Sequence, residues 1–587
     1  MFAFRHFFVL FTILHIEKAT WFVYYKANYT KEVFSLIRFD FRLISSLEKV
    51  LPDQPLKAPE VSSLTLFANE RGSFQLAYSC KREDTLLFSP SASISIESDL
   101  GPALICRSVG LVPSDYPCHS VTDDDYITTR PGLLPDLLRP VDLNQPVKVI
   151  TNQWRALWFT VDASQLTPGQ HTIHFTSRFK NDDTEETVFD QTLTVQVLER
   201  ALPPQTLYHT EWFHADCLAD YYKVPVFSEE HWRLIDAFMA AAVRCGVNML
   251  LTPVFTPPLD TARGGERTTI QLVDVTYENG TYSFGFEKLH RWVELCRKNG
   301  ITEIEIVHLF TQWGAECAPK IMVWENGTLS RRFGWDTPAV GGEYTNLLHA
   351  FLPALKAELA SMDILDHTWF HISDEPYDKN KETYGAAKAS VQELLKGCKV
   401  IDALSSFALY QEGIVEKPVV SANHIQPFLE NKVPGLWAYY CTSQPLQVPN
   451  RFMAMPSSRN RILGVLLYVF DIEGFLHWGF NFYNSQYSIA PIDPFRTTDS
   501  GEAFPSGDPF LVYPAPDGTA WDSIRSEVLH DAMQDVRMLR LAESQLGRER
   551  TLALVTEAAG QELRFDDYPH DPAFFDRLRG MILDALD

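Results

Sequence analysis

An aspartate and a glutamate stand side by side in the segment HISDEP, residues 371–376. The apolar residues before the pair predict a strand, and Pro376 ends it because proline cannot donate to a strand ladder. An arbitrary Asp-Glu pair is most simply a solvated loop, but the carboxyl end of a barrel strand is where active sites form. We therefore predict that Asp374 and Glu375 form an acid/base centre.

The adjacency of these carboxylates limits the chemistry that they can perform. Neighbouring Cα atoms are only about 3.8 Å apart, whereas ordinary retaining glycosidases place one carboxylate on each side of the sugar. Adjacent carboxylates suit hydrolysis in which the sugar's own 2-acetamido oxygen is the nucleophile. We expect Glu375 to act as general acid and then base, and Asp374 to orient the acetamido group. The reverse division of roles stays open.

Aromatic and polar residues stand near the ends of several other predicted strands. Tryptophan stacks well under a pyranose ring, and a tyrosine hydroxyl can donate to the acetamido carbonyl. Only one of Tyr439 and Tyr440 is expected to face the site, because side chains alternate along a strand. The predicted substrate-binding residues are Trp212, His214, Trp437, Tyr439, Tyr440, Trp478 and Asn481.

Strand segments alternate with amphipathic helices from residue 203 onward, which predicts a (β/α)8 TIM barrel. One such helix begins after Ser228, an N-cap residue, and stops at Gly246, a C-cap residue. A hairpin is expected at 272–286, after the second strand, and a doubly wound open sheet is the alternative fold. The predicted strands are 208–213, 248–254, 303–309, 368–373, 400–404, 419–423, 436–440 and 475–480.

Short runs of alternating apolar and polar residues before position 203 predict an antiparallel β-sandwich. The pattern changes at Leu202-Pro203-Pro204, where we place a domain boundary. The predicted domains are a leader or over-long start at 1–40, an accessory β-sandwich at 41–202, the catalytic barrel at 203–545 and a C-terminal helical tail at 546–587.

Several separated motifs resemble those of one family. They are HISDEP at 371–376, GFLHWGFN at 474–481, GDPFLVYP at 507–514, and SIR at 523–525 followed by Asp535. On these motifs, residues 203–540 resemble the barrel proteins grouped as domain of unknown function 4091, which are similar to glycoside hydrolase family 123. The resemblance implies a retaining β-N-acetylgalactosaminidase-like glycosidase, with Asp374 and Glu375 in the roles assigned above. The preceding sandwich fits the same layout.

The charge balance bears on the partners. A formal net charge of −24, from 75 acidic and 51 basic residues, disfavours binding to nucleic acid or to anionic lipid. We find no phosphate-binding glycine loop, nucleotide fingerprint or G-x-S-x-G motif in the sequence. We therefore expect a carbohydrate substrate, no cofactor, and neither nucleic acid nor membrane as a partner, while the oligomeric state stays unpredicted.

The cysteines and the N-terminus bear on localisation. Nine cysteines without any C-x-x-C pair predict reduced thiols. An apolar run at 7–14 follows Arg5 like a short signal peptide, but no convincing small-residue cleavage site follows, and the run is too short to span a membrane. We expect a cytoplasmic protein, and a secreted one if this run is a signal peptide.

Two other functions compete with this interpretation. A metal-dependent barrel hydrolase would use histidines near the strand ends, although their spacing lacks a tight ligand pair. These histidines are His214, His308, His371, His424 and His477. A non-catalytic carbohydrate-binding protein would explain the aromatic residues and the sandwich equally well, but it would not require the Asp374-Glu375 pair.

Overall fold

The computed structural model describes residues 38–81, 91–181 and 184–587. Residues 1–37, most of the predicted leader, lie outside the described residues. Within the described ranges, no helix combines the length and the apolar composition that crossing a membrane requires. All nine cysteines are described, and none of them forms a disulfide with another described residue.

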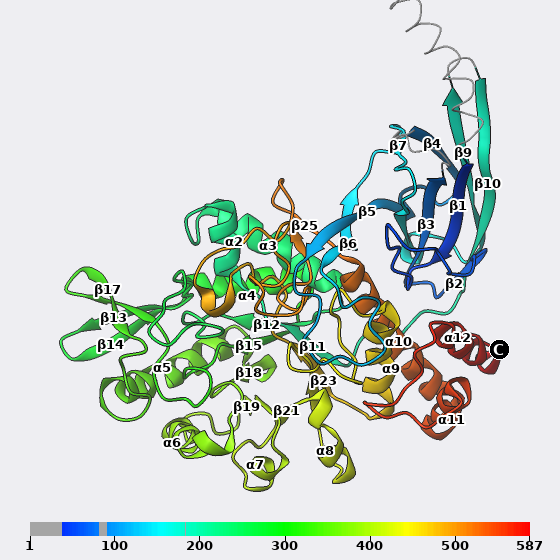
Figure 1. Cartoon of the computed structure of the whole chain (residues 1–587). Helices are drawn as coiled ribbons and strands as arrows, with labels where there is room; N and C mark the ends of the chain where they lie inside the picture. Colours follow the sequence, from blue (N-terminus) through cyan, green and yellow to red (C-terminus); the bar gives the residue numbers. More distant parts are fainter. Residues whose placement is uncertain (1–37, 82–90, 182–183) are drawn as a thin grey trace, which may run out of the picture. The chain divides into compact units, whose positions relative to one another are not determined.

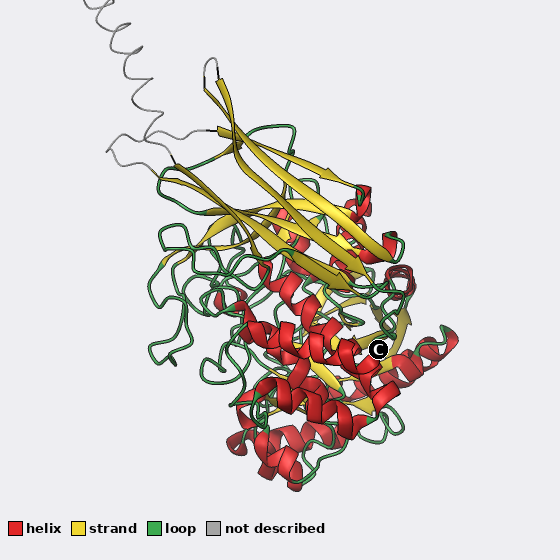
Figure 2. Cartoon of the chain, turned by 90° about the vertical axis from the view of Figure 1, so that its right-hand side faces the viewer, coloured by secondary structure: helices red, strands yellow, loops and turns green. Residues whose placement is uncertain are grey.

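Two β-sheets make up the first of two compact units, which holds the described residues up to 109 and those between 140 and 200 (Figures 1 and 2). One sheet has the order β1-β3-β8-β5 and the other β2-β10-β9-β4-β7. Neighbouring strands are antiparallel, except that β2 runs parallel to β10. The elements are β1 (Arg38–Ser45), β2 (Ser63–Leu66), β3 (Arg71–Lys81), β4 (Ser91–Ser98), η1 (Gly101–Ala103), β5 (Leu104–Ser114), β7 (Val147–Lys148), β8 (Arg155–Asp162), η2 (Ala163–Gln165), β9 (Gly169–Asn181) and β10 (Thr184–Val197).

Apolar residues from both sheets form one hydrophobic core in this unit. Phe74 of β3 stacks on Phe159 of β8 with ring centroids 5.2 Å apart, and Phe175 of β9 meets Phe159 edge-on at the same distance. The period-two alternation that the sequence shows places these rings on the inner faces of the strands. The predicted sheet-rich N-terminal region is thereby confirmed.

Nine parallel strands form a nearly closed barrel in the second unit, which holds residues 110–139 and 201–587. The sheet order is β19-β18-β15-β12-β11-β23-β22-β21-β20, and only Ile401 separates its two outer strands in the chain. All eight predicted strand segments overlap these strands. They are β11 (Tyr208–Glu211), β12 (Met249–Thr252), β15 (Glu303–Ile306), β18 (Thr368–Phe370), β19 (Lys399–Val400), β20 (Asp402–Leu404), β21 (Pro418–Ser421), β22 (Trp437–Tyr439) and β23 (Gly474–His477).

An α-helix separates each barrel strand from the next along the chain, except between β19 and β20. The helix predicted from Ser228 is α3, whose N-cap side chain accepts a hydrogen bond from the His231 N–H. The helices are α2 (Ala215–Tyr222), α3 (Glu229–Arg244), α4 (Glu287–Asn299), α5 (Gly342–Ser361), α6 (Lys381–Val391), α7 (Phe407–Gln411), α8 (Gln426–Glu430), α9 (Ser457–Val469), α10 (Ile524–Leu546), α11 (Arg548–Ala559) and α12 (Ala573–Leu586). Short 3-10 turns are η3 (Leu365–His367), η4 (Asp378–Asn380), η5 (Ala422–His424) and η6 (Gln486–Ser488).

The hairpin predicted at 272–286 is present, but it belongs to a larger sheet. A second hairpin after β15 pairs with it, so that four strands follow the order β14-β13-β16-β17 (Figure 1). These strands are β13 (Asp274–Glu278), β14 (Thr281–Gly285), β16 (Ile321–Glu325) and β17 (Thr328–Phe333), and a further small pair is β24 (Tyr513–Pro514) with β25 (Ala520–Trp521). The sequence pattern did not indicate that the two hairpins would join.

Residues 110–139, which include β6 (Gly132–Pro140), group with the barrel although their sequence pattern matches the sheet-rich region. Buried ion pairs account for this grouping. Arg525 Nε lies 2.9 Å from Asp136 Oδ1, and Arg459 Nη2 lies 2.9 Å from Asp123 Oδ2. A buried arginine requires such a partner, and no local periodicity shows where the partner will come from.

Candidate active site

The Asp-Glu pair follows β18 in the loop that leads to η4. Glu375 has a left-handed backbone with φ of 43°, which residues other than glycine rarely adopt. Such a backbone persists only where the surrounding structure holds it, and residues in this state cluster at functional sites. The loop therefore has the local strain expected of an active-site segment.

A pocket with a cavity volume of about 120 Å³ surrounds the pair. Its wall is mainly aromatic and apolar with a few polar groups, as is usual for a ligand site. Five of the nine predicted site residues line it, from β22 and from the loops at the ends of β11, β18 and β23. They are Trp212, Asp374, Glu375, Tyr439 and Trp478.

Two tyrosine hydroxyls hold the Glu375 carboxylate. Tyr439 donates to Oε1, and Tyr377 donates to Oε2 at 3.0 Å. Hydrogen bonds to an ionised oxygen stabilise the charged form of a carboxylate. Burial and the Glu375 charge raise the pKa of Tyr439 well above its usual value, so this hydroxyl keeps its proton and remains a donor.

The Asp374 carboxyl, unlike that of Glu375, accepts no hydrogen bond from the described residues. Burial raises its pKa well above the usual value for an aspartate, and the charge of Glu375 raises it further. His371 acts in the opposite direction, and no hydrogen bond from the described residues offsets the burial. Asp374 therefore retains its proton to a higher pH than an isolated aspartic acid does.

A buried network supports the pocket wall. The His371 ring lies between two carboxylates, with Nε2 against Glu305 and Nδ1 3.1 Å from Asp402 Oδ1. Burial opposes the charged form, but the two carboxylates raise the pKa of His371 to about 10, so the ring is a cation at neutral pH. Glu305 also accepts a hydrogen bond from the Trp212 Nε1 at 2.8 Å. The network thereby fixes the orientation of the Trp212 ring.

Comparison with protein families agrees with this site. The family model described as glycoside hydrolase 123, catalytic domain, matches residues 212–542, more than half of the chain. The chain belongs to glycoside hydrolase family 123. The resemblance drawn from the separated motifs is confirmed, and the barrel with its pocket is the catalytic domain of a glycoside hydrolase.

Solved structures extend the comparison. The structure of a family 123 glycoside hydrolase from Clostridium perfringens, analysed for glycolipid glycan hydrolysis, is 13% identical and aligns with a TM-score of 0.68 over 93% of this chain and 98% of that chain. This likeness shows the fold. Two further structures align too weakly to bear on the fold. One is a family 2 β-galacturonidase from Eisenbergiella tayi, with 9% identity and a TM-score of 0.30 over 85% of this chain and 72% of that chain. The other is an endo-β-1,4-mannanase from Thermotoga petrophila, with 12% identity and a TM-score of 0.29 over 57% of this chain and 77% of that chain. No curated protein matches the sequence.

Two predicted sugar-binding residues of this family 123 hydrolase, His214 and Asn481, lie outside the pocket. Asn481 Oδ1 accepts from the His214 backbone N–H at 2.8 Å, and its Nδ2 donates to the His214 carbonyl at 3.1 Å. His214 Nε2 in turn donates to the Trp478 carbonyl at 2.9 Å. Burial and the charge of Arg267 lower the pKa of His214 to about 3, so the ring is neutral. Both side chains hold the loop that carries Trp478, and the predicted sugar contacts of His214 and Asn481 stay a prediction.

Trp437 and Tyr440 also lie outside the pocket, for reasons of strand geometry. Trp437 is the first residue of β22, whereas the site lies at the strand ends, and its ring stacks on Tyr208 with centroids 5.5 Å apart. Tyr440 points away from its neighbour, and its hydroxyl donates to Asn460 Oδ1 at 3.3 Å. Tyr439 lines the pocket, whereas Trp437 and Tyr440 do not, and sugar binding by these three residues stays a prediction.

The pocket wall also contains residues that the sequence pattern did not single out as site residues. Gln312 and Trp313 follow the third predicted strand, so their position was a usable signal. Asp260 and Phe504 belong to long loops, and only the folded chain brings them to the site. Burial raises the pKa of Asp260 to about 6. The added lining residues are Leu259, Asp260, Gln312, Trp313, Ala403, Cys441, Leu476 and Phe504.

A buried aspartate outside the pocket orients Trp478. The indole Nε1 donates to Asp508 Oδ2 at 3.0 Å. Burial raises the pKa of Asp508 to about 7. His477 Nε2 lies 3.4 Å from the other oxygen of this carboxyl. The angle of the Trp478 ring in the wall is therefore set by groups that do not meet the ligand.

The metal alternative can be tested on the histidine geometry. His308, His371 and Asp402 have potential ligand atoms within 4.8 Å of one another. The two imidazole rings are stacked, with centroids 4.3 Å apart and planes 20° apart. Because nitrogen lone pairs lie in the ring plane, stacked rings direct them side by side and not toward one ion. His371 is hydrogen-bonded to Asp402 and Glu305, whereas neither ring nitrogen of His308 has a hydrogen-bond partner among the described residues.

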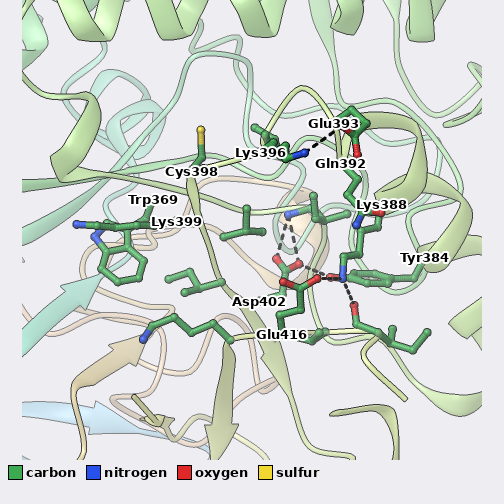
Figure 3. A pocket seen from close by; sticks show the side chains of 18 of the residues that line it. Trp369, Tyr384, Lys388, Gln392, Glu393, Lys396, Cys398, Lys399, Asp402 and Glu416 are labelled. Carbon is green, nitrogen blue, oxygen red and sulfur yellow. Dashed lines mark hydrogen bonds and ion pairs between the residues drawn. The ribbon is translucent and has the colours of Figure 1, made fainter. Parts of the chain in front are cut away.

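A larger hollow, with a cavity volume of about 770 Å³, lies near the strand starts and is shown in Figure 3. Its wall includes Trp369 in β18 and Lys399, the first residue of β19. Its lysines are paired, for example Lys388 with Glu416 at 3.0 Å. Active sites of parallel sheets form at the carboxyl ends of the strands, so the pocket around Asp374 is the candidate active site.

Proposed function

We propose that the chain is a retaining glycosidase that hydrolyses β-linked 2-acetamido-2-deoxy sugars, and N-acetylgalactosaminides in particular. The adjacency of Asp374 and Glu375 in one small pocket carries this proposal. Two neighbouring carboxylates are poorly placed to lie on opposite faces of a sugar, as a direct double displacement requires. A nucleophile supplied by the substrate removes that requirement. The choice of N-acetylgalactosamine comes from the family resemblance of the motifs.

In the first step, the acetamido oxygen attacks the anomeric carbon as the glycosidic bond breaks, and the Glu375 proton goes to the leaving oxygen. Asp374 accepts the acetamido N–H and stabilises the positive charge of the cyclic oxazolinium intermediate. In the second step, water attacks the anomeric carbon, Glu375 takes its proton, and the acetamido group reforms. Two inversions at one carbon give net retention.

The position of the proton before the reaction needs an explanation. Burial favours the neutral form of Asp374, and the Glu375 carboxylate accepts hydrogen bonds from two tyrosine hydroxyls. The proposed mechanism requires a proton on Glu375 and an ionised Asp374. An acetamido N–H that donates to Asp374 stabilises its ionised form and transfers the shared proton to Glu375. Substrate binding therefore prepares the general acid.

Aromatic wall residues have the remaining roles in this proposal. Trp212 and Trp478 enclose the sugar ring, with orientations set by Glu305 and Asp508. Tyr439 donates to Glu375 in the free site and can donate to the acetamido carbonyl when the substrate enters. A donor at that oxygen orients it for attack.

We also propose that the barrel is a (β/α)8 barrel in which β19 and β20 are one strand interrupted at Ile401, and that the first unit is an accessory β-sandwich. The domain division at 202–203 is retained, with residues 110–139 assigned to the barrel. The lack of disulfides among the described cysteines supports a cytoplasmic location.

The direct test uses aryl β-glycosides of N-acetylgalactosamine and N-acetylglucosamine, with and without a thiazoline mimic of the cyclic intermediate. We expect cleavage of the galacto substrate, a β-configured first product, and inhibition by the thiazoline. Cleavage that the thiazoline leaves unaffected would count against substrate assistance. Sugar binding without any cleavage, unchanged in Asp374→Asn and Glu375→Gln, would favour a carbohydrate-binding protein.

A further inference from the structure

Two exposed aromatic rings lie together beside the pocket. Trp313 lines the pocket yet is 43% exposed, and Tyr487 is 39% exposed. Their rings meet edge-on with centroids 6.2 Å apart. Large apolar side chains that remain exposed next to a binding pocket mark a surface for a ligand.

Hydrogen bonds tie three loops into this surface. The Trp313 N–H donates to the Asp374 carbonyl at 3.2 Å, so the ring is anchored to the catalytic segment. The Tyr487 N–H donates to Asp260 Oδ2 at 2.9 Å, and Ser488 Oγ donates to the Asp260 carbonyl at 2.7 Å. The aromatic pair is therefore positioned by the active site and is not a loose surface feature.

Backbone strain at the same residues supports a functional origin. Asp260, Trp313 and Tyr487 have φ angles of 37°, 61° and 59°. A left-handed backbone is uncommon for residues with bulky side chains and is retained where the surrounding contacts enforce it. One such contact is the Asp260 N–H, which donates to Gln312 Oε1 at 2.7 Å.

The burial of the pocket wall decides which part of a substrate would reach this surface. Trp212, Leu476 and Tyr439 are almost fully buried, so the inner end of the pocket is closed. A sugar ring bound there leaves its substituent pointing to the mouth. Glu375 Oε2 accepts a hydrogen bond from Tyr377, whose ring is also exposed, so the proton donor faces the mouth as well.

We propose that Trp313 and Tyr487 form a subsite for the leaving group, and that the leaving group is a second pyranose ring. This inference rests on the proposed function, because it takes Glu375 to protonate the leaving oxygen. The sugar stacks on the aromatic surface, and one of its hydroxyls donates to Asp260 Oδ1. The enzyme therefore acts on the terminal unit of a β-linked disaccharide or longer glycan.

The chemistry of the surface favours a sugar over an apolar chain. Asp260 places a carboxylate beside the rings, and a carboxylate is an acceptor for hydroxyls that an alkyl chain cannot satisfy. A ring with one apolar face and polar edges matches an aromatic platform next to an acceptor.

Three substrates separate the possibilities. One is a disaccharide with β-linked N-acetylgalactosamine on a second pyranose, one is the β-glycosyl fluoride of N-acetylgalactosamine, which has no leaving-group ring, and one is the octyl glycoside. We expect Trp313→Ala and Tyr487→Ala each to lower the ratio of kcat/KM for the disaccharide to kcat/KM for the fluoride about tenfold. Trp324→Ala is the matched control, because Trp324 is 39% exposed on β16 and outside the pocket. Its ratio is expected to equal that of the wild type.

Each result has one meaning. A ratio within twofold of the wild type in both variants would overturn the subsite while the proposed function stands. Equal loss on disaccharide and fluoride would show a general structural effect, and a larger loss on the octyl glycoside would show an apolar leaving group; either result overturns the proposal. Turnover of none of the three substrates by the wild type would remove the proposed function itself. Trp313→Phe, which retains a ring, covers the case in which Trp313→Ala fails to fold.

Discussion

Carboxylates and tryptophans occur both at the starts and at the ends of the parallel strands, but their partners differ. At the starts, Lys399 lies 3.5 Å from Glu303, and the rings of Trp369 and Trp437 pack with centroids 5.0 Å apart. At the ends, Asp374 is half-buried, its carboxyl has no hydrogen bond from the described residues, and Trp313 is exposed. Groups that satisfy one another stabilise the fold, whereas groups left for an external partner indicate function.

The largest expected effect distinguishes a carboxylate at the strand ends, Glu375, from one at the strand starts, Glu473. Glu375→Gln is expected to lower kcat for an N-acetylgalactosaminide with a poor leaving group about 1,000-fold, because proton transfer to that group is lost. The loss should be much smaller with a 2,4-dinitrophenyl leaving group. Glu473→Gln is the control, because Glu473 pairs with Lys417 near the strand starts. Equal losses with both leaving groups would contradict the acid role.

Tryptophans at the strand starts should affect stability, whereas tryptophans at the strand ends should affect kcat/KM. Trp437→Ala is expected to lower the free energy of unfolding of the barrel by about 3–5 kcal/mol, because it leaves a cavity in a fully buried position. Trp478→Ala should instead lower kcat/KM about tenfold through the loss of a wall for the sugar. Urea denaturation and steady-state kinetics on both variants separate the effects. A loss of kcat/KM without destabilisation in Trp437→Ala would contradict the assignment.

Tyr439 and Tyr440 offer a comparison between adjacent residues. Tyr439→Phe removes a donor to Glu375 and is expected to lower kcat about tenfold, which corresponds to a hydrogen bond to a charged group. Tyr440→Phe removes only a bond to Asn460 and should leave kcat within twofold. Kinetics on the two variants measure this difference, and similar values would show that facing the pocket is unimportant here.

The smallest expected effect concerns pH. The Asp260 carboxyl, with a pKa of about 6, is neutral below that pH and ionised above it. Because the ionised form accepts a hydroxyl more strongly, the ratio of kcat/KM for the disaccharide to that for the glycosyl fluoride should rise about threefold from pH 5 to pH 7. The need of the disaccharide for general acid catalysis is the same in the wild type and in Asp260→Asn, so the difference between their two pH profiles isolates Asp260. The rise should be absent in Asp260→Asn, and its persistence there would remove Asp260 from the subsite.

Local sequence signals were sufficient to predict most of the elements and to single out the Asp374-Glu375 pair as the candidate catalytic centre. Ser228 caps α3 as predicted, since capping depends only on residues within one turn. The pair at Asp374 and Glu375 could be found because an apolar strand runs directly into it and proline follows. Each of these features is a relation between near neighbours, which the sequence displays.

The tertiary structure alone decided which side chains meet at the pocket. Trp437 and Trp478 have similar sequence surroundings, yet one lies at the start of β22 and the other lines the site. Asp260 reaches the pocket from a long loop, and Asp136 joins the barrel through Arg525, 389 positions away. Long-range pairing of this kind depends on which buried charges and rings find partners across the fold, and no local period records that choice.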